Sequence, residues 1–86
     1  MYFVYVLQSK VDGQLYVGFT EDLDERLHSH NKGSVPSTQN RKPWQRIFSE
    51  CYIQKGDALR REQYLKTTAG KRVLKLMLRD TLKSKD

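Results

Sequence analysis

The stretch GQLYVGFTEDLDERLHSH, residues 13–30, joins the end of a β-strand to the start of a helix. Thr20 can cap the helix, and four acidic residues within positions 21–25 suit the positive end of the helix dipole. One side of the helix carries residues with the spacing i, i+3, i+4 and i+7. These residues are Leu23, Arg26, Leu27 and His30. An arginine and a histidine therefore share the stripe that two leucines direct toward the core.

A β-hairpin is expected to precede this helix. Residues 2–9 are rich in β-formers, Asp12-Gly13 is a turn signal, and residues 14–20 return as a second strand. With an even number of loop residues, one face of the hairpin is apolar and the other is mixed. The apolar face holds Tyr2, Val4, Val6, Leu15, Val17 and Phe19. The mixed face holds Phe3, Tyr5, Leu7, Gln14, Tyr16 and Gly18. Gly18 has no side chain, so it leaves space for a ligand close to two phenols.

The remaining chain predicts one more strand and two more helices. Gly33 ends the first helix, a polar loop follows, and residues 46–53 form the third strand. Residues 54–70 predict a helix capped by Asp57 and closed by Gly70. Residues 71–83 predict an amphipathic helix with Val73, Leu74, Met77 and Leu78 facing inward. The order ββαβαα predicts a single α+β domain over residues 1–86, with helices flanking a three-stranded antiparallel sheet.

The composition indicates which class of partner the protein binds and in which compartment it is expected. The formal net charge is +6, which favours a polyanion, most simply a nucleic acid. The single cysteine, Cys51, excludes a disulfide framework, fits a reducing cytoplasm, and is expected to be a small buried packing residue. The apolar start of the chain is too short for a signal peptide, and nothing reaches transmembrane length, so no membrane association is expected.

The second helix repeats the unusual stripe of the first. Glu62 belongs to a set with the spacing i, i+3, i+4 and i+7, together with Ala58, Arg61 and Leu65. A buried carboxylate is unfavourable unless it is paired or binds a metal. One interpretation is a structural protein with a buried Arg26–Glu62 salt bridge. The other is an active site with a cation for phosphate, a carboxylate for a divalent metal, and phenols and an imidazole for proton transfer.

The order and spacing of these residues resemble a known family of nucleases. FVY at residues 3–5, ten intervening residues, and YVG at residues 16–18 resemble the GIY-YIG nuclease motif. Arg26, His30 and Glu62 stand at positions that belong to the same pattern. Asn31, directly after the histidine, fits it too. The resemblance covers essentially the whole chain and is strongest to small stand-alone proteins related to the excinuclease nuclease domain.

Three positions depart from that pattern. The first motif lacks its glycine, the second has Val17 in place of isoleucine, and Phe19 stands where the excinuclease branch has a lysine near the scissile phosphate.

The resemblance implies metal-dependent hydrolysis of phosphodiester bonds in DNA, in repair, recombination or the processing of foreign DNA. Glu62 would bind one Mg²⁺ or Mn²⁺ ion, which keeps mostly water ligands. Arg26 would contact the non-bridging oxygens and stabilise the developing charge. Tyr5 or Tyr16 would take a proton from the attacking water. His30 is a second candidate base, or the group that orients the phenol.

Candidate substrate contacts come from the polar loop and from a basic row on the later helices. Loop side chains could donate to phosphates. They are Ser37, Thr38, Asn40, Arg41 and Lys42. Lys66, Lys71 and Arg72 could extend this track, and Trp44 could stack on a base or pack under the loop. The alternative function is a non-catalytic nucleic-acid-binding module that keeps the fold and the basic surface.

Overall fold

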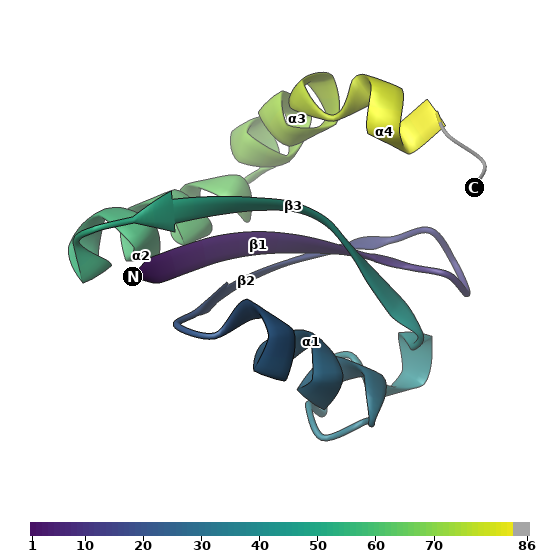
Figure 1. The fold of residues 1–86 in the computed structure, drawn as a ribbon. Helices are drawn as coiled ribbons and strands as arrows, with labels where there is room; N and C mark the ends of the chain where they lie inside the picture. Colours follow the sequence, from purple (N-terminus) through teal and green to yellow (C-terminus); the bar gives the residue numbers. More distant parts are fainter. Residues whose placement is uncertain (84–86) are drawn as a thin grey trace.

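The computed structural model describes residues 1–83 and has a three-stranded antiparallel sheet with the strand order β2-β1-β3. The elements are β1 (Tyr2–Ser9), β2 (Leu15–Thr20), α1 (Leu23–Asn31), the 3₁₀ turn η1 (Gln39–Arg41), β3 (Trp44–Tyr52), α2 (Lys55–Leu65), α3 (Thr68–Met77) and α4 (Arg79–Lys83). Helix α1 covers one face of the sheet, and α3 and α4 lie over the other (Figure 1). The α+β fold with a three-stranded antiparallel sheet is thus confirmed. Within residues 1–83, no helix has the length and apolar character needed to cross a membrane.

The hairpin has an even-loop register, so its two faces are the expected ones. Gly13 adopts φ +74° at the turn, and Tyr5 pairs directly with Gly18. Since side chains alternate between the faces, β1 contributes to two cores. Val4, Val6 and Val17 pack with α2 and α3 through Ala58, Leu65 and Leu74. Tyr5, Leu7 and Trp44 form a second core, against which Tyr16, Leu23 and Leu27 pack. The mixed face of the hairpin therefore contributes both to the second core and to a polar site.

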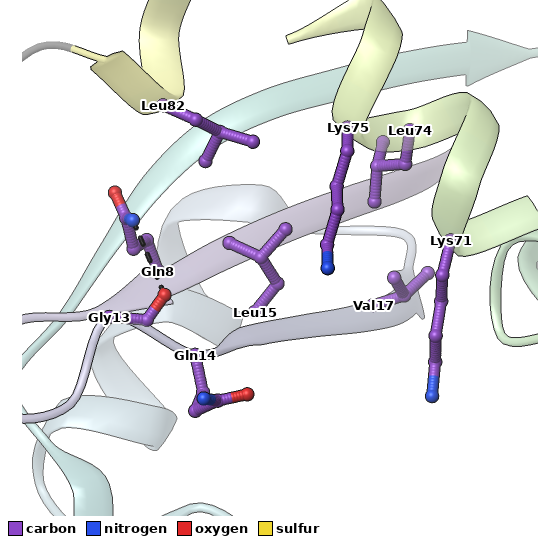
Figure 2. A pocket seen from close by; sticks show the side chains of 9 residues that line it. All are labelled: Gln8, Gly13, Gln14, Leu15, Val17, Lys71, Leu74, Lys75 and Leu82. Atoms are coloured by element: carbon purple, nitrogen blue, oxygen red, sulfur yellow. Dashed lines mark hydrogen bonds between the residues drawn. The ribbon is translucent and has the colours of Figure 1, made fainter. Parts of the chain in front are cut away.

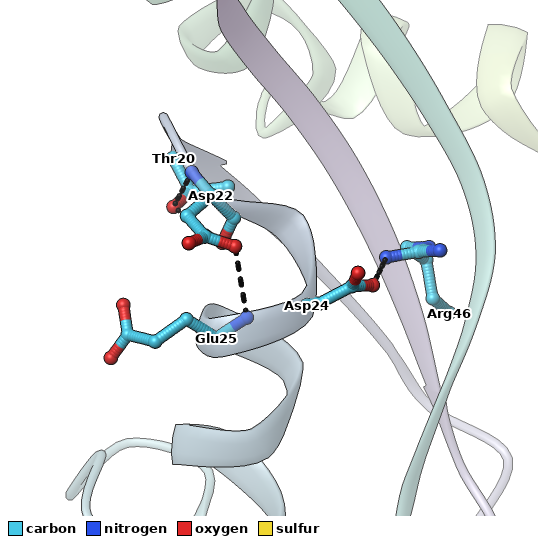
Figure 3. A network of polar contacts seen from close by, with 5 residues as sticks. All are labelled: Thr20, Asp22, Asp24, Glu25 and Arg46. Carbon is cyan, nitrogen blue, oxygen red and sulfur yellow. Dashed lines mark hydrogen bonds and ion pairs between the residues drawn. The ribbon is translucent and has the colours of Figure 1, made fainter.

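Helix α1 begins two residues later than expected. Thr20 remains in β2, and Asp22 is the N-cap, its Oδ1 accepting a hydrogen bond from the Glu25 backbone N at 3.1 Å (Figure 3). The Thr20 hydroxyl instead accepts from the Asp22 backbone N at 3.1 Å, which shapes the turn before the helix. One helical residue, Asp24, then forms a 3.3 Å ion pair with Arg46 of β3, so the helix is also joined to the far edge strand.

The expected helix over residues 54–70 is two helices. Gln54 rather than Asp57 occupies the N-cap position of α2, and the Asp57 carboxylate pairs with Arg60 on the helix surface. The chain turns at Thr67, whose hydroxyl caps α3 by accepting from the Gly70 backbone N at 3.0 Å. The single-helix interpretation is therefore wrong.

Gly70 does not close a helix either. It is buried inside the first turn of α3, and a Cβ atom added there would lie 1.9 Å from the Tyr64 carbonyl oxygen of α2. Only a glycine lets the two helices approach so closely.

Two other burial expectations are also wrong. Met77 is 41% exposed, because Leu74 and Leu78 supply the inward positions of this segment. Cys51 is exposed rather than buried, near the end of β3 and opposite Phe3 of β1.

Strand β3 contains a bulge that the sequence pattern does not reveal. Val6 pairs with Phe48, but the next residue of β1, Leu7, pairs with Arg46. Ile47 is therefore one extra residue in β3, and the facing of its side chains changes phase there. Phe48 packs against the core under α2 and α3, whereas Trp44 joins Tyr5 and Leu7 on the α1 side.

Candidate active site

The centre of the site is the hydroxyl of Tyr5. It shares a 2.8 Å hydrogen bond with Nε2 of His30, which lies in the last turn of α1. Tyr5 is 2% exposed and His30 is fully buried. The central strand and the covering helix thus hold a phenol and an imidazole together away from solvent.

Arg26 lies one helical turn before His30 and contacts the same phenol. Its Nε donates to the Tyr5 hydroxyl oxygen at 3.4 Å. The Arg26–Glu62 salt bridge of the structural alternative is not among the ion pairs of residues 1–83, so that alternative is wrong. The inward stripe of α1 carries an arginine and a histidine because both residues bind Tyr5.

The protonation states follow from this burial. Burial raises the pKa of the Tyr5 hydroxyl, and the hydrogen bond from Arg26 opposes that rise. Burial, together with the positive charge of Arg26, lowers the pKa of His30 to about 4. Tyr5 is therefore a neutral phenol and His30 a neutral imidazole at pH 7.

Gly18 faces the Tyr5 ring across the hairpin. A Cβ atom added to Gly18 would lie 2.3 Å from both Cζ and the hydroxyl oxygen of Tyr5. The space above Gly18 is filled by the phenol, so the interpretation of this glycine as a gap for phosphate is wrong. Its missing side chain allows Tyr5 to reach His30.

Tyr16 and Glu62 complete the cluster. The partly exposed Tyr16 ring packs edge-on against the His30 ring, with 5.0 Å between centroids. Lys66 Nζ lies 5.8 Å from the centroid of the Tyr16 ring and 3.1 Å from Glu62 Oε2. The Glu62 carboxylate also contributes to the raised pKa of Tyr5, after burial as the main cause. Side chains from β1, β2, α1 and α2 therefore meet on one side of the sheet.

The chain matches a family of known proteins. The model of the GIY-YIG catalytic domain matches residues 1–75. The chain belongs to the GIY-YIG family. It is 35% identical over 77 residues to a UPF0213 protein of Staphylococcus saprophyticus and to one of Staphylococcus aureus strain Mu50, covering 88% of this chain and 93% of each relative. It also resembles the solution NMR structure of a UPF0213 protein from Bacillus halodurans, with a TM-score of 0.56 and 31% identity, over 90% of this chain and 85% of that one. Most of this chain is thus similar to UPF0213 proteins.

The side chains of this GIY-YIG site include one carboxylate that could bind a divalent cation, that of Glu62. Within residues 1–83, no cluster of three or more His, Cys, Asp or Glu side chains could hold a metal ion. Mg²⁺ does not need one, since it often takes one or two carboxylates and completes its shell with water and substrate phosphate. The Glu62 side chain is 17% exposed and pairs with one flexible lysine. A single accessible carboxylate beside the phenols fits such an ion, provided that Lys66 moves aside.

The loop residues divide into buried and exposed groups. Thr38 has no exposed surface, and its hydroxyl lies 2.8 Å from His30 Nδ1, so the interpretation of Thr38 as a phosphate donor is wrong. Ser37, Asn40 and Lys42 are exposed. Arg41 lies over the Trp44 ring, 5.2 Å from its centroid. Trp44 itself packs under the loop, which is one of the two alternatives given for it above. It donates from Nε1 to the Thr38 carbonyl oxygen at 3.0 Å.

Asn31 joins the end of α1 to the start of β3, a structural role that the sequence does not reveal. Its amide donates to the Trp44 carbonyl oxygen at 3.0 Å and accepts from the Trp44 backbone N at 2.6 Å. This pair of bonds fixes the start of β3 under the end of α1. The available signal was its place directly after His30 in the family pattern.

The basic row on the later helices is divided by the sheet. Lys66 lies beside Tyr16, whereas Lys71 and Lys75 extend from α3 over a groove of about 390 Å³ next to the hairpin (Figure 2). Leu15, Val17, Leu74 and Leu82 line this groove, and all four belong to or pack on the core opposite α1. Arg72 borders a smaller hollow with Lys71 and Lys75. Lys71 and Arg72 therefore do not extend a track from the tyrosine site.

Proposed function

We propose that this GIY-YIG protein is a metal-dependent DNA endonuclease that hydrolyses phosphodiester bonds. The observation that carries the proposal is the convergence on one phenol of His30 and Arg26, with Tyr16 and Glu62 beside them. Such a constellation combines a phosphate-binding cation, proton-transfer groups and a carboxylate. The biological setting we propose is DNA repair, recombination or the processing of foreign DNA.

Arg26 is proposed to bind the scissile phosphate. Its Nε is engaged by Tyr5, and no other hydrogen bond of its guanidinium is found within residues 1–83. The two terminal nitrogens can therefore donate to the non-bridging oxygens, where negative charge develops during hydrolysis. Anchoring through Nε would keep the guanidinium in one orientation before the substrate arrives.

Tyr16 is the phenol that we propose to meet the attacking water. Tyr5 is almost completely buried and its raised pKa disfavours the phenolate, whereas Tyr16 is partly exposed beside Lys66 and Glu62. Tyr5 and His30 would then not contact the water and would hold Arg26 in position through their hydrogen bonds. Glu62 would hold Mg²⁺ or Mn²⁺, which when bound would supply positive charge next to the substrate phosphate. Asn40, Arg41, Lys42 and Lys66 remain proposed contacts to the DNA backbone.

One observation favours the second candidate, a non-catalytic nucleic-acid-binding module. The Lys66–Glu62 ion pair already neutralises the proposed metal ligand without a metal. A protein that keeps this pair closed would bind DNA through its basic side chains and would not cut it.

A cleavage assay separates the two functions. The purified protein is incubated with supercoiled, single-stranded and branched DNA, with Mg²⁺, with Mn²⁺ or with a chelator. We expect cleavage of at least one substrate that requires the metal, is abolished by Glu62→Gln and is unchanged by Glu21→Gln, which alters an exposed carboxylate. DNA binding without cleavage under all metal conditions would favour the binding module.

A further inference from the structure

The backbone of Thr38 is unusually well fixed for a loop residue. Its N donates to the Val35 carbonyl oxygen at 3.1 Å. Its own carbonyl oxygen accepts from the Arg41 backbone N at 3.1 Å and from Nε1 of the buried Trp44 at 3.0 Å. The position of the Thr38 side chain is therefore set by the loop turn and by the second core together.

The Thr38 hydroxyl has two neighbours, and only one of them can donate. It lies 2.8 Å from His30 Nδ1 and donates to the Val35 carbonyl oxygen at 3.3 Å. A carbonyl oxygen can only accept, and a hydroxyl has a single proton. When that proton points to Val35, the hydroxyl oxygen must accept from Nδ1–H. The imidazole proton of neutral His30 then lies on Nδ1, and Nε2 is left as an acceptor.

The Nδ1–H tautomer of His30 also sets the donor and acceptor roles in the bonds of Tyr5 to His30 and Arg26. With Nε2 as acceptor, the Tyr5 hydroxyl donates to His30, and its oxygen lone pair receives the Nε–H of Arg26. In the opposite tautomer, Nε2–H would donate to the Tyr5 oxygen. The Tyr5 proton would then have no acceptor among the contacts of residues 1–83 and would turn toward the cationic guanidinium. Only the Nδ1–H tautomer gives an acceptor to every donor in this row of hydrogen bonds.

We infer that Thr38 is a positioning residue for Arg26, acting through the tautomer of His30. Four hydrogen bonds run in one direction, from Arg26 to Tyr5, to His30, to Thr38 and to the Val35 carbonyl. The hydroxyl selects which ring nitrogen of His30 carries the proton, and so decides whether Tyr5 presents a lone pair or a proton to Arg26. The consequence for cleavage rests on the proposed nuclease function, whereas the tautomer and the Arg26 hydrogen bond do not.

Nitrogen NMR of the folded protein tests the inference directly. The chain has two histidines, and His28 is exposed, so His28→Gln leaves His30 as the only imidazole to observe. Long-range ¹H–¹⁵N spectra at pH 7 are expected to show a protonated Nδ1 and an unprotonated Nε2. A protonated Nε2 in this otherwise unchanged protein would overturn the inference without any change at Thr38.

Two substitutions at Thr38 supply the matched pair. Thr38→Val keeps the shape and removes the hydroxyl, so the Nε2–H tautomer should become the major form and the Arg26 Nε–H should exchange faster with water. Thr38→Ser keeps the hydroxyl and should restore both signals to their positions in the parent protein. An unchanged Nδ1–H signal in folded Thr38→Val would refute the role. If that variant does not fold, the parent spectrum and the Thr38→Ser spectrum still decide, since either one with Nε2–H would refute it.

Cleavage kinetics then connect the tautomer to the chemistry. Thr38→Val should lower kcat at least tenfold with a smaller change in KM, and Thr38→Ser should recover most of the rate. Equal kcat for all three proteins, alongside a shifted tautomer, would refute the positioning role of Thr38. If the parent protein cuts no DNA, the nuclease proposal fails, while the two spectra still decide whether Thr38 directs the Arg26 hydrogen bond.

Discussion

The Tyr5 hydroxyl lies between an imidazole and a guanidinium and is almost completely closed off from water. Each of these three groups needs the others, because a buried polar atom without a partner is destabilising. The residues were predictable from the sequence, since the spacing of Arg26 and His30 places both on the inward stripe of α1. Their common partner was not, because it depends on how far β1 and α1 are apart in space.

Tyr5→Phe should destabilise the protein. The change removes only the hydroxyl and leaves His30 Nε2 buried without a donor, which costs about 1–3 kcal/mol of unfolding free energy. Urea denaturation measures the loss. Tyr64→Phe is the control, because Tyr64 is 40% exposed and its substitution should stay within about 0.5 kcal/mol. Equal stability of both variants would mean that the Tyr5–His30 bond contributes nothing.

His30 should make stability depend on pH below neutrality. Its pKa in the folded protein, about 4, is lower than its unfolded value near 6.5, so protons bind preferentially to the unfolded chain. The unfolding free energy should therefore be full above pH 7 and fall by about 2 kcal/mol between pH 7 and pH 5. Denaturation curves at these two pH values measure it. His28→Gln should keep this loss, and His30→Gln should remove it; the same slope in both variants would assign the loss to other groups.

The elements show which structural signals are local and which are not. The two faces of the hairpin were predictable from the period of two once the loop has an even number of residues, but the exact pairing was not, because every even loop length gives the same faces. The break between α2 and α3 was not, since the helical pattern continues through it and Gly70 is needed only where two helices touch. Thr20 does not cap the first helix, because it belongs to β2 and pairs with Phe3 of β1, and Asp22 occupies the N-cap position instead.

The bulge in β3 shows the same limit more clearly. Trp44 and Phe48 are four residues apart, so regular alternation predicts that they lie on one face of the sheet. They lie on opposite faces, because Ile47 is accommodated as an extra residue. The sequence of one strand does not determine where a bulge interrupts its pairing with the neighbouring strand. The site residues of the hairpin and α1 could therefore be predicted, whereas the packing that buries Trp44 and Thr38 could not.

Gly18→Ala should damage both stability and the site. Alanine is better suited than glycine to a strand interior, yet its Cβ would overlap the Tyr5 ring and force the phenol away from His30. We expect a loss of about 1–3 kcal/mol, which thermal unfolding measures, together with loss of cleavage. Gly56→Ala is the control, because the nearest side-chain atom to its Cβ lies at an ordinary 3.5 Å, so it should be neutral or stabilising. A Gly18→Ala protein as stable and active as Gly56→Ala would show that Tyr5 is not tightly held.

At the scale of the whole molecule, positive charge is spread over both sides of a body that measures 33 × 29 × 20 Å. Lys42 and Lys66 lie near the loop and Tyr16, while Lys71 and Lys75 lie over the groove on the other side of the sheet. The net charge of +6 therefore does not by itself define one binding surface. DNA that reaches the proposed active site would meet only the first group.

DNA binding should weaken steeply with salt, and the two groups of lysines should differ. If about 4 to 6 phosphates are neutralised, the slope of log affinity against log salt on duplex DNA should be about −4 to −5. Lys42→Ala should make this slope shallower by about 1, because it removes one phosphate contact, and Lys75→Ala should leave it unchanged. Fluorescence anisotropy over a salt series measures both. A larger effect from Lys75 would place the DNA on the groove side.

The extra residue at Ile47 decides which changes of length the chain can accept during evolution. Removing one residue from β1 would exchange its two faces, sending Tyr5 toward α3 and the valines toward α1. Deleting Ile47 would instead return β3 to regular alternation and turn Trp44 away from Leu7 and from the loop above it. Insertions and deletions are thus excluded from the strands that carry the site. We expect relatives to vary in length at the hairpin turn and in residues 32–34, where no strand or helix has to keep its phase and the Val35–Thr38 turn is left intact.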